Sequence, residues 1–222
     1  MTLLQEHPKY RLRRDKLVQT LLRKGIVVKP VLEAIGRIPR QLFIDSAFDA
    51  RAYDDSPLPI GHGQTISQPY TVARQTELLC PQPGERILEV GTGSGYQAAV
   101  LLELGVKLYS IERLRPLHER ARDTLRALGY TQMQLKCGDG TQGWRAYAPF
   151  DGIIVTAGAP VVPEDLISQL ADGGRLIIPV GDDQGQQMLR IIRKGDEFIE
   201  EDHNTFKFVK LIGKKGWDAP GT

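Results

Sequence analysis

A glycine-rich segment near the middle of the chain limits the possible folds more than any other feature. Residues 86–95 read Arg-Ile-Leu-Glu-Val-Gly-Thr-Gly-Ser-Gly, and the helix-prone residues 96–102 follow directly. This order is typical of a buried strand, a tight turn and a helix, because glycine adopts backbone angles that such a turn requires. The N–H groups at the start of the helix would face a ligand. We therefore predict a nucleotide-binding turn.

The spacing of the glycines distinguishes two kinds of nucleotide ligand. The dinucleotide pattern is G-x-G-x-x-G, but here Gly95 comes one residue early and Tyr96 stands where that pattern requires glycine. The form that begins at Glu89, E-x-G-x-G-x-G, is the pattern of S-adenosylmethionine-dependent methyltransferases. A purely structural strand-to-helix turn is the alternative reading of the glycines alone.

Strands and helices alternate after this turn. We predict the following elements: strands at 108–111, 133–137, 151–156 and 175–180, and helices at 114–128 and 163–170. Such alternation is typical of an α/β fold, a doubly wound, Rossmann-like parallel sheet with helices on both faces. Residues 187–193 and 197–211 have no helix between them, so we expect antiparallel strands at one edge.

The first 80 residues precede this alternation. Amphipathic spacing predicts a helix over 9–24 that ends at Gly25, and short helices follow at 30–36, 39–43 and 71–80. We therefore expect a helical N-terminal cap with a loop over residues 1–80, packed on a methyltransferase core over residues 81–222 as a single compact unit.

Residues 53–70 are rich in proline, glycine and small polar side chains. This composition excludes a long regular element. A long irregular segment in a compact domain is typical of a functional loop, although a connector that wraps around the core has the same composition.

Charge and composition limit the compartment and the partners. The chain has 222 residues and a formal net charge of +2, and its basic cluster at residues 9–16 is interpreted as the solvated face of a helix rather than a nucleic-acid contact. No apolar run is long enough to indicate secretion or a membrane span. The chain has only two cysteines, Cys80 and Cys137, and four scattered histidines, so the sequence indicates neither a disulfide framework nor a metal site. We expect a cytoplasmic monomer.

Two acidic residues follow predicted strands, where a ligand lies in such a sheet. Glu112 comes about twenty residues after the glycine turn and could accept hydrogen bonds from ribose hydroxyls. Asp139, followed by Gly140, could accept a hydrogen bond from an adenine amino group, or it could belong to an ordinary Asp-Gly turn. Together with the glycine spacing, they favour S-adenosylmethionine over a nicotinamide dinucleotide.

The loop before the glycine turn carries a more specific pattern. Residues 58–69 read Leu-Pro-Ile-Gly-His-Gly-Gln-Thr-Ile-Ser-Gln-Pro, which closely resembles the signature of protein-L-isoaspartate O-methyltransferases. Further matches, among them 38–40, 88–99, 110–113, 138–140, 178–181 and 208–209, extend the resemblance over residues 31–213.

The resemblance implies an enzyme that repairs damaged protein. It implies transfer of a methyl group from S-adenosyl-L-methionine to the free α-carboxylate of L-isoaspartyl residues in peptides and proteins. The products are a methyl ester and S-adenosyl-L-homocysteine, and the ester then closes to a succinimide. From the histidine and cysteine spacing and from the charge, we expect neither a metal ion nor a nucleic-acid partner.

The resemblance also implies roles for particular residues. Ser67 is implied as the catalytic serine, which we expect to orient the acceptor carboxylate because no base is identifiable beside it. The methyl-donor site is implied at Gln64, Thr65, Ile66, Ser67, Glu89, Gly91, Gly93, Gly95, Glu112, Asp139 and Gly140. The peptide site is implied at Ile60, Gly61, His62, Phe208 and Val209, on the loop and on a strand around 208–209.

One residue departs from the family pattern. Lys210 stands where the family commonly has proline, and we hypothesise that it tunes peptide binding. Two alternative functions stay open at this point: a methyltransferase that acts on an RNA or another small molecule, and a catalytically silent protein that binds S-adenosylmethionine.

Overall fold

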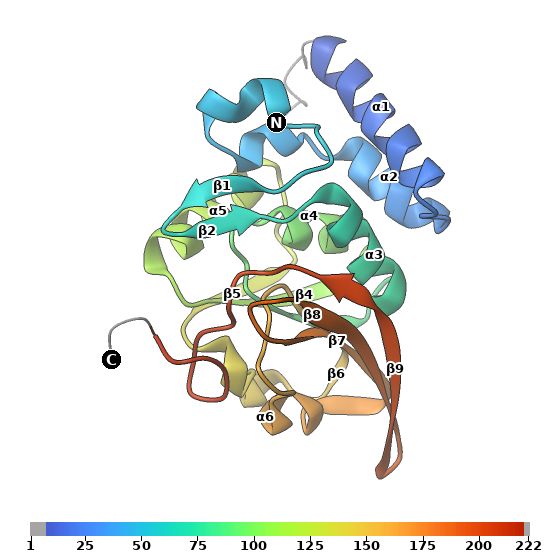
Figure 1. Ribbon diagram of the computed structural model, residues 1–222, viewed down its shortest axis with the longest axis vertical. Helices are drawn as coiled ribbons and strands as arrows, with labels where there is room; N and C mark the ends of the chain where they lie inside the picture. The colour runs from blue at the N-terminus through green and yellow to red at the C-terminus, as the bar shows by residue number, and fades with distance from the viewer. Residues whose placement is uncertain (1–7, 220–222) are drawn as a thin grey trace.

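Seven strands form one sheet through the centre of the molecule (Figure 1). The computed structural model describes residues 8–219. The strand order is β5-β4-β3-β6-β7-β8-β9, and the bounds are β3 Arg86–Val90, β4 Lys107–Glu112, β5 Met133–Cys137, β6 Phe150–Val155, β7 Leu170–Gly181, β8 Gln186–Lys194 and β9 Glu197–Phe206. The first five in this order are parallel, and β8 runs antiparallel to both neighbours. The predicted α/β sheet with an antiparallel edge is confirmed.

Helices cover both faces of the sheet. The helices after the cap are α3 Pro69–Leu79, α4 Tyr96–Glu103, α5 Arg115–Ala127 and α6 Glu164–Ile167, with one-turn 3-10 helices η3 Gly140–Gln142 and η4 Arg145–Tyr147. Neighbouring residues of β3 point to opposite faces. Ile87 lies in a core shared with Leu101 of α4, whereas Leu88 lies in a second core with Leu166 of α6.

The N-terminal cap shares the first of these cores. It consists of α1 Pro8–Arg23, α2 Lys29–Arg37 and the 3-10 helices η1 Arg40–Phe43 and η2 Ser46–Arg51. Leu21 of α1 and Ile35 of α2 are fully buried in the same cluster as Leu101. The cap was predicted over residues 1–80 and the core over residues 81–222; residues 1–7 of the first range and 220–222 of the second lie outside the described residues. Within residues 8–219, no helix is both long and apolar enough to cross a lipid bilayer.

The predicted boundaries are wrong at the junction of α6 and β7. The helix expected over 163–170 is limited to Glu164–Ile167, and β7 begins at Leu170 rather than at 175. The reason is that the Gln169 carbonyl accepts a hydrogen bond from Phe150 N–H at 2.8 Å, which draws the chain into the sheet early. Gly173, with φ of +73°, then allows the strand to bend before its regular part.

The last strand ends five residues before its predicted limit. β9 stops at Phe206, so Phe208 and Val209 lie beyond it rather than on a strand. The chain leaves β8 at this point and pairs with Gly158 after β6. Gly158 N–H donates to Val209 O at 2.8 Å, and Leu211 N–H donates to Gly158 O at 2.8 Å.

The proline- and glycine-rich segment contains no long element, as predicted, but it does form a short hairpin. β1 Leu58–Gly61 pairs antiparallel with β2 Gln64–Ile66. His62 and Gly63 make the turn with φ of +53° and +67°. Ser67 follows the end of β2 directly and lies two residues before Pro69, the first residue of α3.

Candidate active site

The glycine turn connects β3 to α4. Its glycines have positive φ: Gly91 +98°, Gly93 +54° and Gly95 +88°. A Cβ atom at Gly91 would lie 2.5 Å from Thr156 Oγ1, closer than packed atoms allow. The Thr156 hydroxyl instead donates to Gly91 O at 2.6 Å. The end of β6 therefore holds the turn in place, and only glycine fits at position 91.

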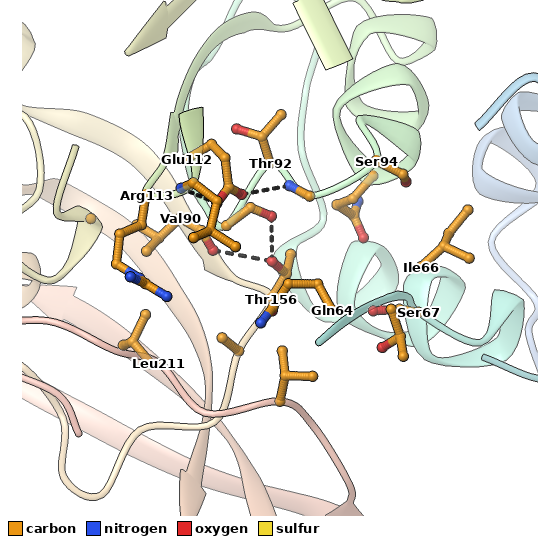
Figure 2. A pocket seen from close by; sticks show the side chains of 18 of the residues that line it. Gln64, Ile66, Ser67, Val90, Thr92, Ser94, Glu112, Arg113, Thr156 and Leu211 are labelled. Carbon is orange, nitrogen blue, oxygen red and sulfur yellow. Dashed lines mark hydrogen bonds between the residues drawn. The ribbon is translucent and has the colours of Figure 1, made fainter. Parts of the chain in front are cut away.

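Glu112, the last residue of β4, holds the same turn from the other side (Figure 2). Its Oε2 atom accepts a hydrogen bond from Gly93 N–H and its Oε1 atom one from Leu114 N–H, both at 2.8 Å. The residue is only 6% exposed and lines the cavity described next. Because each carboxylate oxygen has two acceptor positions, both oxygens can still accept from a ligand.

A cavity opens over the turn, and we call it the glycine-turn cavity. Figure 2 shows Ile66 and Ser67 on one side of it and Glu112 and Arg113 on the other. Its lining residues are Gln64–Ser67, Val72, Val90–Ser94, Tyr96, Gln97, Ile111–Leu114, Gly140, Thr156, Ala157 and Val209–Ile212.

A second cavity adjoins the first. We call it the β9 groove, and its lining residues are Lys24, Pro57, Thr65, Ser67, Gln68, Tyr70, Thr71, Thr156, Gln184 and Thr205–Val209. Four residues line both cavities: Thr65, Ser67, Thr156 and Val209. The two cavities therefore meet at a boundary with three hydroxyl-bearing residues: Thr65 and Ser67 come from the hairpin segment, and Thr156 follows β6.

A buried arginine lies behind Ser67. Arg40 is fully buried, and its Nη2 atom donates to the Ser67 carbonyl oxygen at 3.1 Å. Its guanidinium carbon lies 4.6 Å from the centre of the Tyr96 ring, while Nε and Nη1 have no hydrogen-bond partner. Burial lowers the pKa of Arg40 from its ordinary value. Arg40 lies in the 38–40 family match, but its place in the sequence indicated no role for it.

Glu89 lies below the turn rather than in the cavity. It is fully buried on β3 and accepts a hydrogen bond from Ser110 Oγ, which in turn lies 2.6 Å from Thr92 Oγ1. Burial is the largest effect on the pKa of Glu89 and raises it, the Ser110 hydrogen bond lowers it and the nearby Glu112 carboxylate raises it, so that the pKa is about 8. Glu89 is therefore connected to the turn through Thr92.

Asp139 faces the C-terminal segment. Its oxygens accept hydrogen bonds from Thr141 N–H and Lys214 N–H, each at 2.9 Å. Burial raises the pKa of Asp139, but hydrogen bonds from Lys214, Thr141 and Gln142 outweigh it and leave the pKa below its ordinary value. The residue does not line the glycine-turn cavity, although Gly140 does.

The structure brings most of the predicted site residues together. The predicted donor residues that line the glycine-turn cavity are Gln64, Thr65, Ile66, Ser67, Gly91, Gly93, Glu112 and Gly140. Gly95 does not; an added Cβ there would lie 3.3 Å from Ala121 Cβ, so this glycine admits α5. Of the predicted peptide residues, Phe208 and Val209 line the β9 groove, and Ile60, Gly61 and His62 do not.

Thr156 is the clearest residue that the sequence reasoning missed. It follows the carboxyl end of β6, next to β3 in the sheet. That position was a usable signal, because ligands lie at the carboxyl ends of parallel strands. Gln184 and Lys207 in the β9 groove carried no comparable signal, since their place depends on how β8 and β9 fold back.

Comparison with known proteins decides the family. The profile of the protein-L-isoaspartate(D-aspartate) O-methyltransferase family matches residues 12–216. This chain belongs to that family. A protein-L-isoaspartate O-methyltransferase of Cytophaga hutchinsonii is 51% identical over 207 residues, which cover 93% of each chain. Another, of Marinobacter nauticus, is 54% identical over 200 residues, covering 90% of this chain and 91% of the relative.

Solved structures of isoaspartate methyltransferases have the same fold. One protein-L-isoaspartate O-methyltransferase superimposes with a TM-score of 0.84 at 30% identity, over 91% of this chain and 67% of its own. A Plasmodium falciparum structure named for the same methyltransferase, in complex with S-adenosyl-L-homocysteine, gives a TM-score of 0.78 at 26% identity, over 90% and 98%. Within residues 8–219 of this chain, no three His, Cys, Asp or Glu residues come together as a metal site.

Proposed function

We propose that this protein moves a methyl group from S-adenosyl-L-methionine to the free α-carboxylate of L-isoaspartyl residues in damaged peptides and proteins. The observation that carries the proposal is the boundary shared by the two cavities at Thr65, Ser67, Thr156 and Val209. A nucleoside in the glycine-turn cavity and a peptide in the β9 groove would bring their reacting groups together there. The products are the methyl ester and S-adenosyl-L-homocysteine.

The glycine-turn cavity fits the methyl donor. The absence of side chains at Gly91 and Gly93 leaves the turn open to close contact, and Glu112 keeps acceptor positions for two ribose hydroxyls. Gln97 Oε1 is buried without a hydrogen-bond partner, and Gln97 lines the cavity. When bound, S-adenosyl-L-methionine supplies an electrophilic methyl group on a sulfonium centre.

The predicted donor residues divide into two groups in this proposal. The residues that contact the donor are Gln64, Thr65, Ile66, Ser67, Gly91, Gly93, Glu112 and Gly140. Glu89 and Gly95 support the turn from outside the cavity, and Asp139 supports the C-terminal segment through Lys214.

The acceptor needs orientation rather than a base. A free α-carboxylate has a pKa of roughly 3.5, so it is already ionised at neutral pH. Ser67, at the boundary of the two cavities, holds this carboxylate by a hydrogen bond. The residues of the boundary exclude water from it, which makes the oxygen a better nucleophile. This explains how a site without a titrating dyad can perform the reaction.

The peptide lies along the β9 groove against Phe208 and Val209. Main-chain pairing suits a substrate of arbitrary sequence. Ile60 is buried and packs against the glycine turn: a Cβ atom added at Gly93 would lie 3.7 Å from Ile60 Cδ1. Gly61 and His62 are exposed at the tip of the hairpin, where they contact only the more distant parts of a protein substrate.

We further propose that the enzyme acts as a cytoplasmic monomer on protein rather than on nucleic acid. Both cysteines are free thiols, as in reducing compartments. Part of the basic N-terminal cluster is used internally, because Lys9 forms an ion pair with Asp49 at 3.4 Å. The proposal also treats the cap and the methyltransferase core as one compact unit, which their shared core supports.

A pair of peptides tests the function. A synthetic peptide with a central L-isoaspartyl residue and its normal aspartyl twin are incubated with the enzyme and methyl-labelled S-adenosyl-L-methionine. We expect a base-labile methyl ester and an equal amount of S-adenosyl-L-homocysteine only with the isoaspartyl member. Absence of methylation of the isoaspartyl peptide would overturn the proposal, and labelling of an RNA or a small molecule instead would support the alternative acceptor.

A further inference from the structure

The charged side chains that line the β9 groove are both cationic. They are Lys24 and Lys207, and no described aspartate or glutamate lines the groove. Lys24 is neutralised, because its ammonium group forms an ion pair with the Asp55 carboxylate. Lys207 is exposed and forms no ion pair within residues 8–219. The groove therefore has one uncompensated positive charge.

The carboxylates near the groove are occupied by other groups. Asp55 also accepts hydrogen bonds from Gln68 Nε2 at 3.1 Å and from Tyr70 N–H at 2.8 Å. Asp183, in the turn between β7 and β8, pairs with Lys210 at 3.0 Å. Neither carboxylate is therefore available to neutralise Lys207, and a ligand in the groove would meet its charge directly.

Aromatic residues fix the position of Lys207. The ring of Phe206 stacks on Tyr70 with centroids 6.5 Å apart, and it lies 6.3 Å from the Phe208 ring. The Phe208 N–H donates to Gln186 Oε1 at 2.8 Å, and Gln186 is only 7% exposed. The backbone on both sides of Lys207 is thus attached to the groove, while its ammonium group projects from an exposed side chain.

We infer that Lys207 makes the enzyme favour isoaspartyl peptides that carry a second carboxylate, on an Asp or Glu within two residues of the isoaspartate. The inference rests on the proposed function, which places the reacting carboxylate at Ser67 and the flanking peptide in the β9 groove. Two residues of extended chain span roughly 7 Å, so a flanking side chain remains within the groove. The ion pair between Lys207 and this second carboxylate would be exposed to solvent, so its free energy is modest and salt weakens it.

A peptide series tests this inference. Each peptide has a central isoaspartate and either Glu or Gln at one of the four nearest positions, and kcat/KM is measured with the wild type and with Lys207→Gln. At 50 mM salt we expect a Glu-over-Gln ratio of about three to five at one or more positions. The ratio should approach one at 0.5 M salt and in Lys207→Gln at either salt concentration. Lys207→Glu should instead favour a Lys-flanked peptide.

Lys194→Gln is the matched control. Lys194 is an exposed lysine at the far end of β8 and lines neither cavity, so the same charge is removed away from the groove. This variant should keep the Glu-over-Gln ratio of the wild type. A wild-type ratio of one at all four positions, or an unchanged ratio in Lys207→Gln, would overturn the inference. In both cases, continued methylation of the Gln-flanked peptides would leave the proposed function intact.

Discussion

Arg40 Nη2 donates to the carbonyl oxygen of Ser67 at 3.1 Å from a fully buried position. This bond connects the cap to the residue at the boundary of the two cavities. No carboxylate forms an ion pair with Arg40 among residues 8–219; Tyr96 is the main group that favours its charge, and the more distant Asp55 carboxylate contributes less. A buried charge of this kind is costly for stability, which suggests that it serves the position of Ser67.

Arg40→Met tests that relationship. Methionine fills similar space without charge, so the free energy of unfolding should fall by no more than about 1 kcal/mol, because apolar replacement of buried charges is often neutral or stabilising. The kcat for an isoaspartyl peptide should fall about tenfold or more, since a charge-assisted hydrogen bond contributes ~1.5–3 kcal/mol. Urea unfolding and steady-state kinetics measure the two effects. Arg37→Met, which removes an exposed arginine on α2, is the control, and normal turnover in Arg40→Met would contradict the role.

Ser67→Ala should lower turnover and leave the affinity for the methyl donor nearly unchanged. Its hydroxyl orients the acceptor carboxylate, and loss of a hydrogen bond to a charged group should reduce kcat about ten- to a hundredfold. Initial rates give kcat, and calorimetric titration with S-adenosyl-L-homocysteine gives the affinity. Ser168→Ala, at an exposed serine bonded to Asp165 O, should behave as the wild type.

Glu112→Ala should have the opposite pattern and chiefly weaken donor binding. The change removes the acceptor for ribose and also leaves Gly93 N–H and Leu114 N–H without their partner. We expect the dissociation constant of S-adenosyl-L-homocysteine to rise at least tenfold. Glu119→Ala, on the exposed side of α5, controls for the loss of one negative charge. If Glu112→Ala lowered only kcat and Ser67→Ala lowered only donor affinity, the two role assignments would be wrong.

Glu89 should make stability depend on pH. Its pKa is about 8 in the folded protein, above the ordinary carboxyl value of 4.5, so the folded state retains a proton that the unfolded state loses. This contribution to stability is fully present below pH 4.5 and is lost as the pH rises to about 8.

The free energy of unfolding of the wild type should therefore fall relative to that of Glu89→Gln by up to ~1.4 kcal/mol per pH unit. Glutamine cannot titrate and can still accept the Ser110 hydrogen bond. Urea unfolding of both proteins at four pH values from 5.5 to 8.5 measures the difference. A constant difference over this range would mean that Glu89 does not hold a proton.

Lys210→Pro tests the hypothesis that Lys210 tunes peptide binding. The structure places its ammonium group 3.0 Å from Asp183 and 4.8 Å from the centre of the Trp217 ring, and the residue lines the glycine-turn cavity rather than the β9 groove. We therefore expect unchanged KM values for acidic and neutral isoaspartyl peptides. Stability should change by less than about 1 kcal/mol, because Gly158 pairs with Val209 and Leu211 and not with Lys210 N–H. A KM change confined to acidic peptides would restore the original hypothesis.

The local sequence determined which segments form strands and helices, and it determined the conformation of the glycine turn. Three alternate glycines fix a strand-to-helix turn because other residues do not readily adopt its positive φ angles. The apolar runs of β3 and β6 predicted buried parallel strands for the same kind of local reason. The loop that ends at Ser67 resembled one family closely enough to predict the reaction, and the family profile that matches residues 12–216 confirmed that family.

Only the tertiary structure decided which groups meet. Arg40 and Ser67 are 27 residues apart, and Thr156 lies 65 residues from the Gly91 carbonyl that it binds. Contacts of this kind depend on how the cap, the sheet and the C-terminal segment pack, and no periodicity in the sequence records such packing. The same reason explains why Asp139 and Glu89 were expected in the cavity but lie outside its lining. A side chain's residue type determines what it can bind, while its packed neighbours determine what it can reach.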